Sequence, residues 1–138
     1  MILGIGTDMT SIARIDGALE KHGARFVTRC FSTEESEKIE KSAEMTPQLR
    51  AASYAKRWAA KEACAKALGL GIRNDIYLKD IAVANNPDGR PQLALSGGAK
   101  DRLTAITPGG MTARIDVSLT DEAGMALAFV VISAEAAK

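Results

Sequence analysis

The chain has 138 residues, a length typical of one domain and too short for two full ones. Its formal net charge is +1, so no global charge draws it to nucleic acid or to a membrane surface. Hydrophobic residues make up 46% of the sequence but aromatic residues only 4%, so the core must be built from Ala, Leu, Ile and Val, and association would help to stabilise it.

The N-terminal segment is predicted to be a strand followed by a helix. Residues 2–9 supply the bulky side chains of a strand, in which alternate residues share a face. Gly4, Gly6 and Asp8 therefore point the same way, and the absence of side chains before Asp8 lets another group approach its carboxylate closely. Apolar residues at helical spacing predict a helix over residues 11–22.

Two helices with clear start signals follow. Ser32 precedes Glu35 by three residues, the arrangement of a capping box, and predicts a helix over residues 33–43. A longer helix begins with Pro47 in its first turn and ends at Gly69. At roughly 22 residues, or about 33 Å, it is the longest predicted element.

The rest of the chain reads as strands around one short helix. The turn NPDG between IAVAN and PQLAL predicts a hairpin over residues 81–95, and DEAG between RIDVSLT and MALAFVVI predicts a second hairpin. A short helix is expected over residues 96–106. Because strands and helices do not alternate as βαβ units, the predicted fold class is α+β, in a single domain over residues 1–138.

The cysteines and the N-terminus bear on where the protein works. Cys30 and Cys64 lie far apart without a CxxC pair, which argues for a reducing compartment and against a disulfide framework or a zinc site. The residues MILGIGTDM lack the basic and long apolar regions of a signal peptide. No stretch approaches the ~20 apolar residues of a membrane span. We therefore expect a soluble cytoplasmic protein.

The long helix carries three charges in an alanine-rich stretch, WAAKEACAKALG (residues 58–69). Glu62 and Lys66 lie on one face with the i, i+4 spacing of an exposed ion pair, and spacing alone favours that interpretation. Lys61 lies on the neighbouring face and has no predicted role. Because the helix is nearly apolar all round apart from these residues, it is predicted to pack on several sides.

Asp8 offers a second carboxylate. Oxygen ligands from Asp8 and Glu62, with open positions left, suit Mg²⁺ bound jointly with a substrate phosphate, which Lys66 could contact. Asp8 can equally be a helix N-cap or a turn residue, so the residues alone leave both interpretations open. The glycines beside it lack the spacing of dinucleotide and P-loop motifs. His22 is interpreted as a helix-end residue and Cys64 as a small core residue.

Four segments occur together in this order: GIGTDMTSIARI (4–15), RWAAKEACAKALGLGIRN (57–74), NPDGRPQLAL (86–95) and VSLTDEAGMALAFVVI (117–132). With them the chain closely resembles the holo-acyl-carrier-protein synthases, the short bacterial 4′-phosphopantetheinyl transferases. The resemblance covers nearly the whole chain, and the first two segments are its most specific part. It implies an α+β subunit with a small antiparallel sheet and a long central helix, assembled as a homotrimer with active sites between neighbouring subunits.

The resemblance also implies an activity and a set of residues. Members transfer the phosphopantetheine arm of coenzyme A to a serine of apo acyl carrier protein for fatty acid biosynthesis, leaving adenosine 3′,5′-bisphosphate. The metal ligands for Mg²⁺ or Mn²⁺ fall on Asp8 and Glu62, and the catalytic groups on Glu62 and Lys66. The residues that bind coenzyme A fall on Arg57, Lys66, Gly69, Gly89, Arg90 and Pro91. Basic residues that dock the acidic carrier protein fall on Arg14, Lys21 and Arg25.

Some points stay open at the level of sequence. The base that deprotonates the acceptor serine could be Glu62, a metal-bound water or a substrate phosphate. Many relatives have a histidine where this chain has Asp116, which we expect to be an exposed strand residue. The alternatives to this transferase are another Mg²⁺-dependent phosphoryl-transfer enzyme and a non-catalytic trimeric assembly module, because a fold and a pair of carboxylates do not define a reaction.

Overall fold

The computed structural model describes residues 1–73 and 75–138. It has the predicted α+β architecture, with a three-stranded antiparallel sheet in the order β1-β5-β4 and a separate β2-β3 hairpin. Asn74, which ends the second motif, lies outside the described residues. In chain order the elements are β1 (Ile2–Ser11), α1 (Ile12–His22), α2 (Ala24–Cys30), α3 (Thr33–Glu40), α4 (Pro47–Ala67), the 3-10 helix η1 (Leu78–Asp80), β2 (Ile81–Asn85), β3 (Pro91–Leu95), α5 (Gly97–Ile106), β4 (Met111–Glu122) and β5 (Met125–Ala136).

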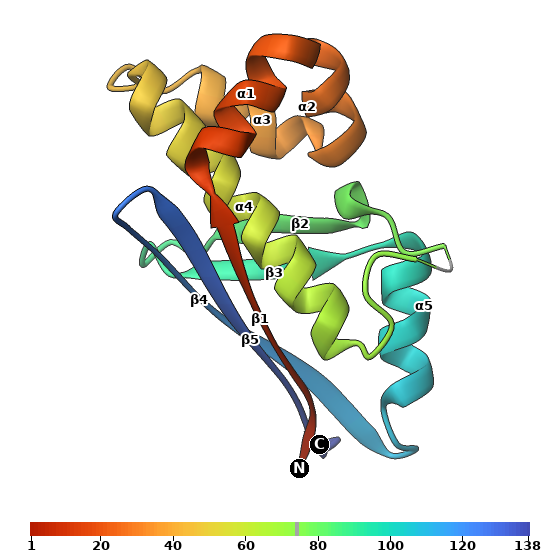
Figure 1. Cartoon of the computed structure of the whole chain (residues 1–138). Coiled ribbons are helices and arrows are strands. Elements are labelled where there is room, and N and C mark those ends of the chain that lie inside the picture. The colour runs from red at the N-terminus through yellow and green to blue at the C-terminus, as the bar shows by residue number, and fades with distance from the viewer. Residues whose placement is uncertain (74) are drawn as a thin grey trace.

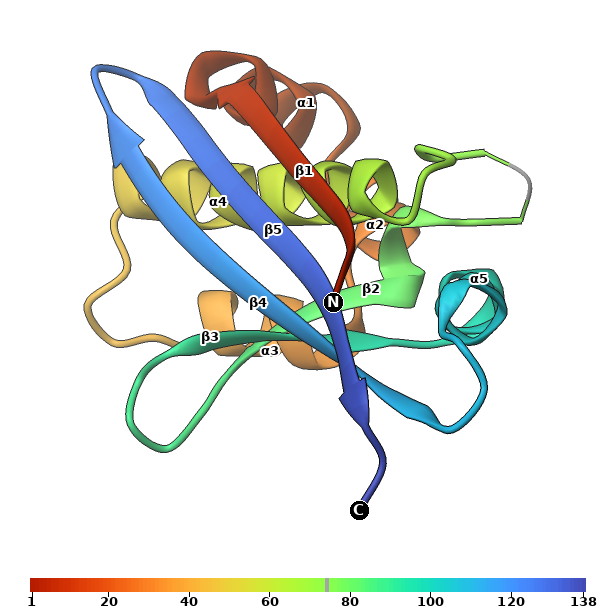
Figure 2. The same cartoon turned by 90° about the horizontal axis from the view of Figure 1, so that it is seen from below.

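The long helix α4 is the centre of the molecule. It lies along one face of the three-stranded sheet, while α1, α2 and α3 gather around its N-terminal half (Figure 1). Seen from below, the β2–β3 hairpin lies on the other side of α4 from β1 (Figure 2). On α4, Ala59, Ala60 and Ala63 are fully buried in the main core cluster, which confirms that the helix packs on several sides.

Local capping signals account for most helix boundaries. The capping box of Ser32 and Glu35 is present at the start of α3, and Thr46 caps α4, which begins at Pro47. The predicted helix over 33–43 is shorter in the structure and ends at Glu40. The helix α2 was not predicted from the sequence, because Gly23 reads as the end of helical structure. In the structure Gly23 has a φ of 50° and connects the end of α1 to the start of α2.

Backbone contact between β1 and α4 explains the glycines at the N-terminus. A Cβ atom on Gly4 would lie 1.9 Å from the carbonyl oxygen of Ala67, and one on Gly6 would lie 1.9 Å from that of Ala63. The bare face of the strand was predicted to leave room beside Asp8 for an approaching group. The group that occupies the space before Asp8 is the backbone of α4 itself.

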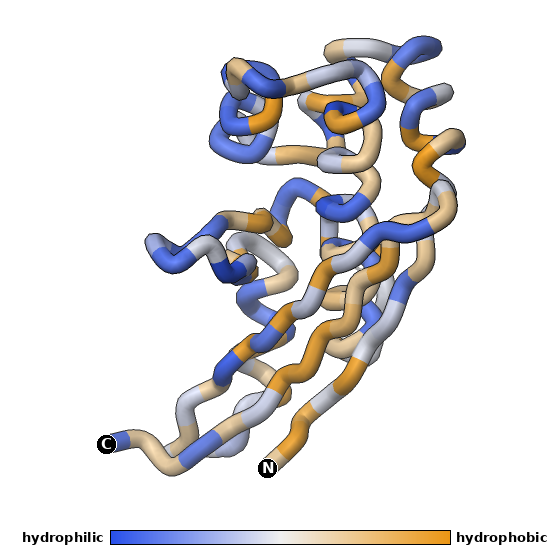
Figure 3. The backbone as a smooth tube through the Cα atoms, turned by 90° about the vertical axis from the view of Figure 1, so that its left-hand side faces the viewer, coloured by the Kyte–Doolittle hydropathy of each residue, from blue (hydrophilic) through white to orange (hydrophobic). Residues whose placement is uncertain are grey.

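The opposite face of the three-stranded sheet exposes large apolar side chains on β1 and β5, beside polar residues of β4. Ile5 and Met9 of β1 and Leu127 and Phe129 of β5 are between 37% and 62% exposed. Strand register pairs Met9 with Leu127 directly, so these side chains form one patch, which we call the apolar sheet face. Figure 3 shows hydrophobic positions following these strands along much of their length.

Within the described part of the chain, no helix has the length and apolar character needed to cross a membrane.

The close contact between β1 and α4 predicts a strong effect of one methyl group. Gly6→Ala should lower the free energy of unfolding by about 3 kcal/mol or more, because the added methyl collides with the backbone carbonyl of Ala63, which cannot rotate away. Gly17→Ala is the matched control, since nothing lies within 4 Å of a Cβ atom at that position. This substitution should raise the free energy of unfolding by about 0.5–1 kcal/mol, because alanine favours the helix α1 more than glycine does. Urea unfolding followed by circular dichroism measures both, and equal stability of the two variants would contradict the contact.

Candidate active site

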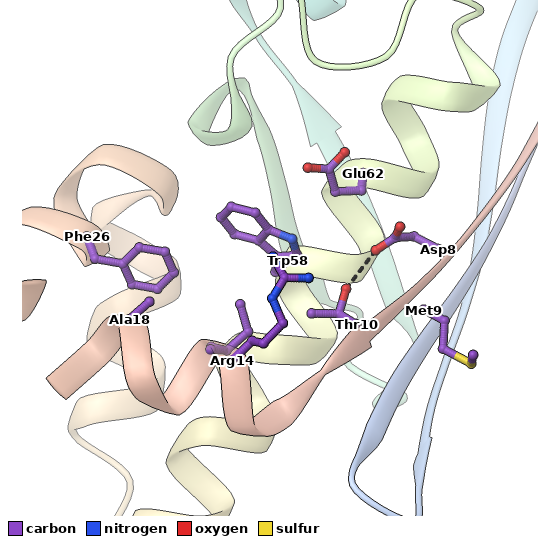
Figure 4. Close-up of a pocket in the computed structure, with 9 residues that line it drawn as sticks. Asp8, Met9, Thr10, Arg14, Ala18, Phe26, Trp58 and Glu62 are labelled. Carbon is purple, nitrogen blue, oxygen red and sulfur yellow. Dashed lines mark hydrogen bonds between the residues drawn. The ribbon is translucent and has the colours of Figure 1, made fainter. Parts of the chain in front are cut away.

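Asp8 and Glu62 meet in one cavity of about 310 Å³. Asp8 lies on the face of β1 that packs on α4, and Glu62 lies one residue before Ala63, the residue that touches Gly6. Figure 4 shows both carboxylates on the cavity wall with Thr10, Arg14 and Trp58. The N-cap interpretation of Asp8 is wrong, because Ser11 caps α1 and Asp8 instead accepts a 2.7 Å hydrogen bond from the Thr10 hydroxyl.

The two carboxylates influence each other. The pKa of Glu62 is raised, first by burial and then by the negative charge of Asp8, while Lys66 acts in the opposite direction. Lys66 Nζ lies 3.3 Å from Asp8 Oδ1 and donates a 2.9 Å hydrogen bond to the carbonyl oxygen of Thr7. Lys66 and Arg14 offset the charges of the two carboxylates, whose oxygen atoms remain the groups in this cavity that suit a cation.

The favoured interpretation of Glu62 and Lys66 as an ion pair within the helix is wrong. Among the described residues, the ion pair that Lys66 makes is with Asp8, from a strand that lies 58 residues away in the chain. Its side chain is 52% exposed, so it can turn toward a bound anion at little cost. Glu62 therefore keeps its carboxylate available to a ligand.

The donor set fits a hard cation only in part. Over residues 1–73 and 75–138, no cluster of three or more His, Cys, Asp or Glu side chains is placed to hold a metal ion. Asp8 and Glu62 could supply two oxygen ligands, and a magnesium ion commonly completes its shell with water and substrate phosphate. The residues present are therefore compatible with a jointly bound cation and unsuited to an all-protein metal cage.

One of the three basic residues predicted to dock a partner lines this cavity. Arg14 lines it directly. Arg25 lines an adjoining cavity together with His22, Phe26 and Arg29, and Lys21 is exposed in the last turn of α1. The wall of the cavity that holds Asp8 and Glu62 also has an apolar part, which was not predicted from the sequence. There the rings of Phe26 and Trp58 stack with centroids 5.8 Å apart.

Except for Lys66, the residues predicted to bind coenzyme A lie elsewhere in the chain. Arg57 and Pro91 line a separate cavity with Val83 and Asn85, next to the turn that carries Gly89. Glycine at position 89 has a φ of 86°, which that turn requires.

The remaining predicted contacts also lie outside the Asp8 cavity. Arg90 is exposed and pairs with Asp88 at 3.0 Å. Gly69 takes up a φ of 87° just beyond the end of α4 and does not line the cavity. Apart from Lys66, the predicted coenzyme A contacts therefore lie away from the predicted metal ligands in this chain.

Three further residues singled out from the sequence lie outside the Asp8 cavity. Cys64 is a core residue as predicted, and burial raises the pKa of its thiol to about 12. Asp116 is exposed on β4, as expected, and forms a 2.9 Å ion pair with Arg114. Lys61, which had no predicted role, is fully buried and pairs with Glu35.

Comparison with known proteins shows the family of this chain. The sequence profile of the 4′-phosphopantetheinyl transferase superfamily matches residues 4–120. The chain belongs to this superfamily. It is 57% identical to the holo-[acyl-carrier-protein] synthase of Rhodopseudomonas palustris strain TIE-1, over 97% of this chain and 91% of the relative.

Solved structures of such synthases share the fold. The enzyme from Neisseria meningitidis superposes with a TM-score of 0.78 at 34% identity, covering 96% of this chain and 99% of that chain. The enzyme from Helicobacter pylori, solved in complex with coenzyme A, gives a TM-score of 0.75 at 30% identity, covering 94% and 99%. The protein is thus a transferase, and the alternative of a non-catalytic assembly module is wrong.

Proposed function

We propose that this protein transfers the 4′-phosphopantetheine group of coenzyme A to a serine of apo acyl carrier protein, for fatty acid biosynthesis. The observation that carries the proposal is the meeting of Asp8 and Glu62 in one cavity, in a chain of this superfamily. The serine oxygen forms a bond to the β-phosphorus while the bond from that phosphorus to the bridging oxygen breaks. Adenosine 3′,5′-bisphosphate leaves, and the serine proton passes to a base.

Asp8 and Glu62 would hold Mg²⁺ or Mn²⁺ beside the reacting diphosphate. Such an ion would neutralise part of the charge that develops on the diphosphate. The raised pKa of Glu62 supports this assignment, because burial and the neighbouring Asp8 together oppose a bare negative charge. Lys66 would leave its contact with Asp8 to bind a phosphate oxygen, since its side chain is half exposed.

The nucleotide would be bound between two subunits of a homotrimer. The predicted contacts Arg57 and Pro91 line a different cavity from Asp8 and Glu62, so a second copy can bring the two sets together. The apolar sheet face gives a second reason, because uncovered apolar strands commonly mark an interface. Each active site would then need residues from two copies.

Carrier protein would dock on α1 and α2 beside the cavity. Arg14 at the cavity, with Lys21 and Arg25 further along, offers positive charge to an acidic partner. Charge complementarity of this kind raises the association rate and is screened by salt. Cytoplasmic localisation remains a prediction from the sequence.

The transfer activity can be tested by mass spectrometry. Apo carrier protein incubated with coenzyme A, Mg²⁺ and the protein should gain the mass of one phosphopantetheine, and a chelator should abolish the gain. Asp8→Asn and Glu62→Gln should each lower kcat/KM by on the order of 10²–10³-fold, because the isosteric amides remove the charges that face the cation. Asp101→Asn, an exposed change on α5, serves as the control. Nucleotide turnover without any carrier protein would instead favour another phosphoryl-transfer enzyme.

The docking surface predicts a salt-dependent effect. Arg14→Glu should raise KM for carrier protein by about tenfold at low salt, and the difference from wild type should shrink as ionic strength rises. Lys100→Glu on α5 makes the same change in net charge away from α1 and should leave KM unchanged. Steady-state kinetics over a series of NaCl concentrations measures both, and equal effects of the two variants would exclude docking through Arg14.

The apolar sheet face predicts a dependence of activity on assembly. Phe129→Asp should convert the trimer to monomers, because a charge in an apolar interface remains unpaired, and transfer should fall with assembly. Leu49→Asp places the same charge on an exposed residue of α4 outside this face and should remain trimeric. Light scattering after size exclusion gives the mass, and a monomeric variant of full activity would contradict a shared site.

A further inference from the structure

A buried carboxylate on α3 lies between two cations of α4. Glu35 Oε1 accepts hydrogen bonds from Lys61 Nζ at 2.6 Å and from the Ser32 backbone amide at 3.0 Å. Its other oxygen, Oε2, accepts a 3.1 Å hydrogen bond from the Val83 amide and lies 4.0 Å from Arg57 Nε. Glu35 therefore connects α3, α4 and β2, three elements that Figure 2 shows around the lower side of the long helix.

Lys61 uses its charge entirely within this cluster. It is fully buried, and it also donates hydrogen bonds to the carbonyl oxygens of Leu78 and Ile81. Its ammonium lies 5.2 Å from the centroid of the Phe31 ring. Lys61 is thus held by α3, η1 and β2 and takes no part in the Asp8 cavity, and its partners leave it no donor to offer a ligand.

Arg57 is the unsatisfied member of the cluster. Its Nε is buried without a hydrogen-bond partner, while Nη1 donates to the Ser53 carbonyl oxygen of its own helix at 3.3 Å. Two cations share the one carboxylate of Glu35, so the cluster keeps one positive charge. That charge opens to the cavity that Arg57 lines with Pro91, where Lys38 and Lys56 add further cations.

We propose that Glu35 and Lys61 are positioning residues that hold the Arg57 guanidinium in one place and leave its charge free for an anionic group of the substrate. Because Lys61 pairs with Oε1, Glu35 faces Arg57 only through Oε2, 4.0 Å from Nε, which is close enough for electrostatic attraction and too long for a hydrogen bond. An arginine held in place whose charge is only partly offset favours a phosphate ligand. The proposal rests on the proposed function only for the identity of that ligand, coenzyme A.

A purely structural role for the pair makes a different prediction. If Glu35 and Lys61 served only to dock α3 on α4, their loss would lower stability and would affect kinetics independently of Arg57. Glu40 provides the comparison, because it also joins α3 to α4, through Arg50 Nε at 2.6 Å and the Tyr54 hydroxyl at 3.1 Å. Glu40 makes no described contact with Arg57.

A double-mutant cycle separates the two roles. Glu35→Gln should raise KM for coenzyme A by about tenfold with kcat within about twofold, because the guanidinium loses its orientation. In a protein that already carries Arg57→Ala, Glu35→Gln should raise KM for coenzyme A by less than about twofold, because Glu35 acts on KM through Arg57. Glu40→Gln should leave KM unchanged even where it lowers the melting temperature. Additive effects of Glu35→Gln and Arg57→Ala, or an equal rise in KM for Glu40→Gln, would overturn the proposal.

Stability is measured alongside the kinetics. If Glu35→Gln loses its cooperative unfolding transition, the cycle is run with Lys61→Met, which keeps a long apolar side chain and leaves Glu35 to pair with Arg57 alone. KM for coenzyme A should then rise about tenfold in the wild-type background and less than about twofold with Arg57→Ala. Additivity would overturn the proposal here too. Failure of the proposed function would look different from failure of this proposal, because the wild-type protein would then transfer no phosphopantetheine to carrier protein.

Discussion

Direct backbone contact between β1 and α4 is the constraint on which the site depends. Gly4 and Gly6 have no side chain, so the strand approaches the carbonyl oxygens of Ala67 and Ala63 closely. Asp8 follows Gly6 by one strand repeat, and Glu62 precedes Ala63 by one residue. The contact therefore brings two carboxylates from distant parts of the chain into one cavity. The alanines of α4 also allow close approach, since their small side chains let the helix pack tightly on several sides.

The long helix separates two electrostatic environments. On the side of β1, Asp8 and Glu62 share a cavity with Arg14 and lie beside Lys66, and burial, followed by the negative charge of Asp8, raises the pKa of Glu62. In the cluster shared with α3 and β2, the cations Arg57 and Lys61 outnumber Glu35. One region suits a divalent cation and the other an anion. A substrate with a metal-bound diphosphate and further phosphate charge matches this division, provided that a second copy brings the two cavities together.

Local signals predicted much of the fold, and the motifs pointed to Asp8 and Glu62, which the structure places in one cavity. The capping box of Ser32 and Glu35, the two hairpins and the long helix all follow from short-range patterns, and the structure contains them. The pairing of Glu35 with Lys61 could not be predicted, because the two residues lie 26 positions apart and Glu35 already had a local explanation as a capping residue. The helix α2 was missed because a glycine at a bend resembles a glycine at a helix end. The distance between the predicted metal and nucleotide residues depends on tertiary packing, which no motif contains.

The most direct test is a crystal structure with Mn²⁺ and coenzyme A, in which anomalous scattering locates the ion. One strong peak should lie about 2.0–2.3 Å from an oxygen of Asp8 and from an oxygen of Glu62. The diphosphate should lie on that ion, and the nucleotide should extend to Arg57 of a neighbouring copy. A peak that contacts neither carboxylate, or coenzyme A bound wholly within one subunit, would contradict it.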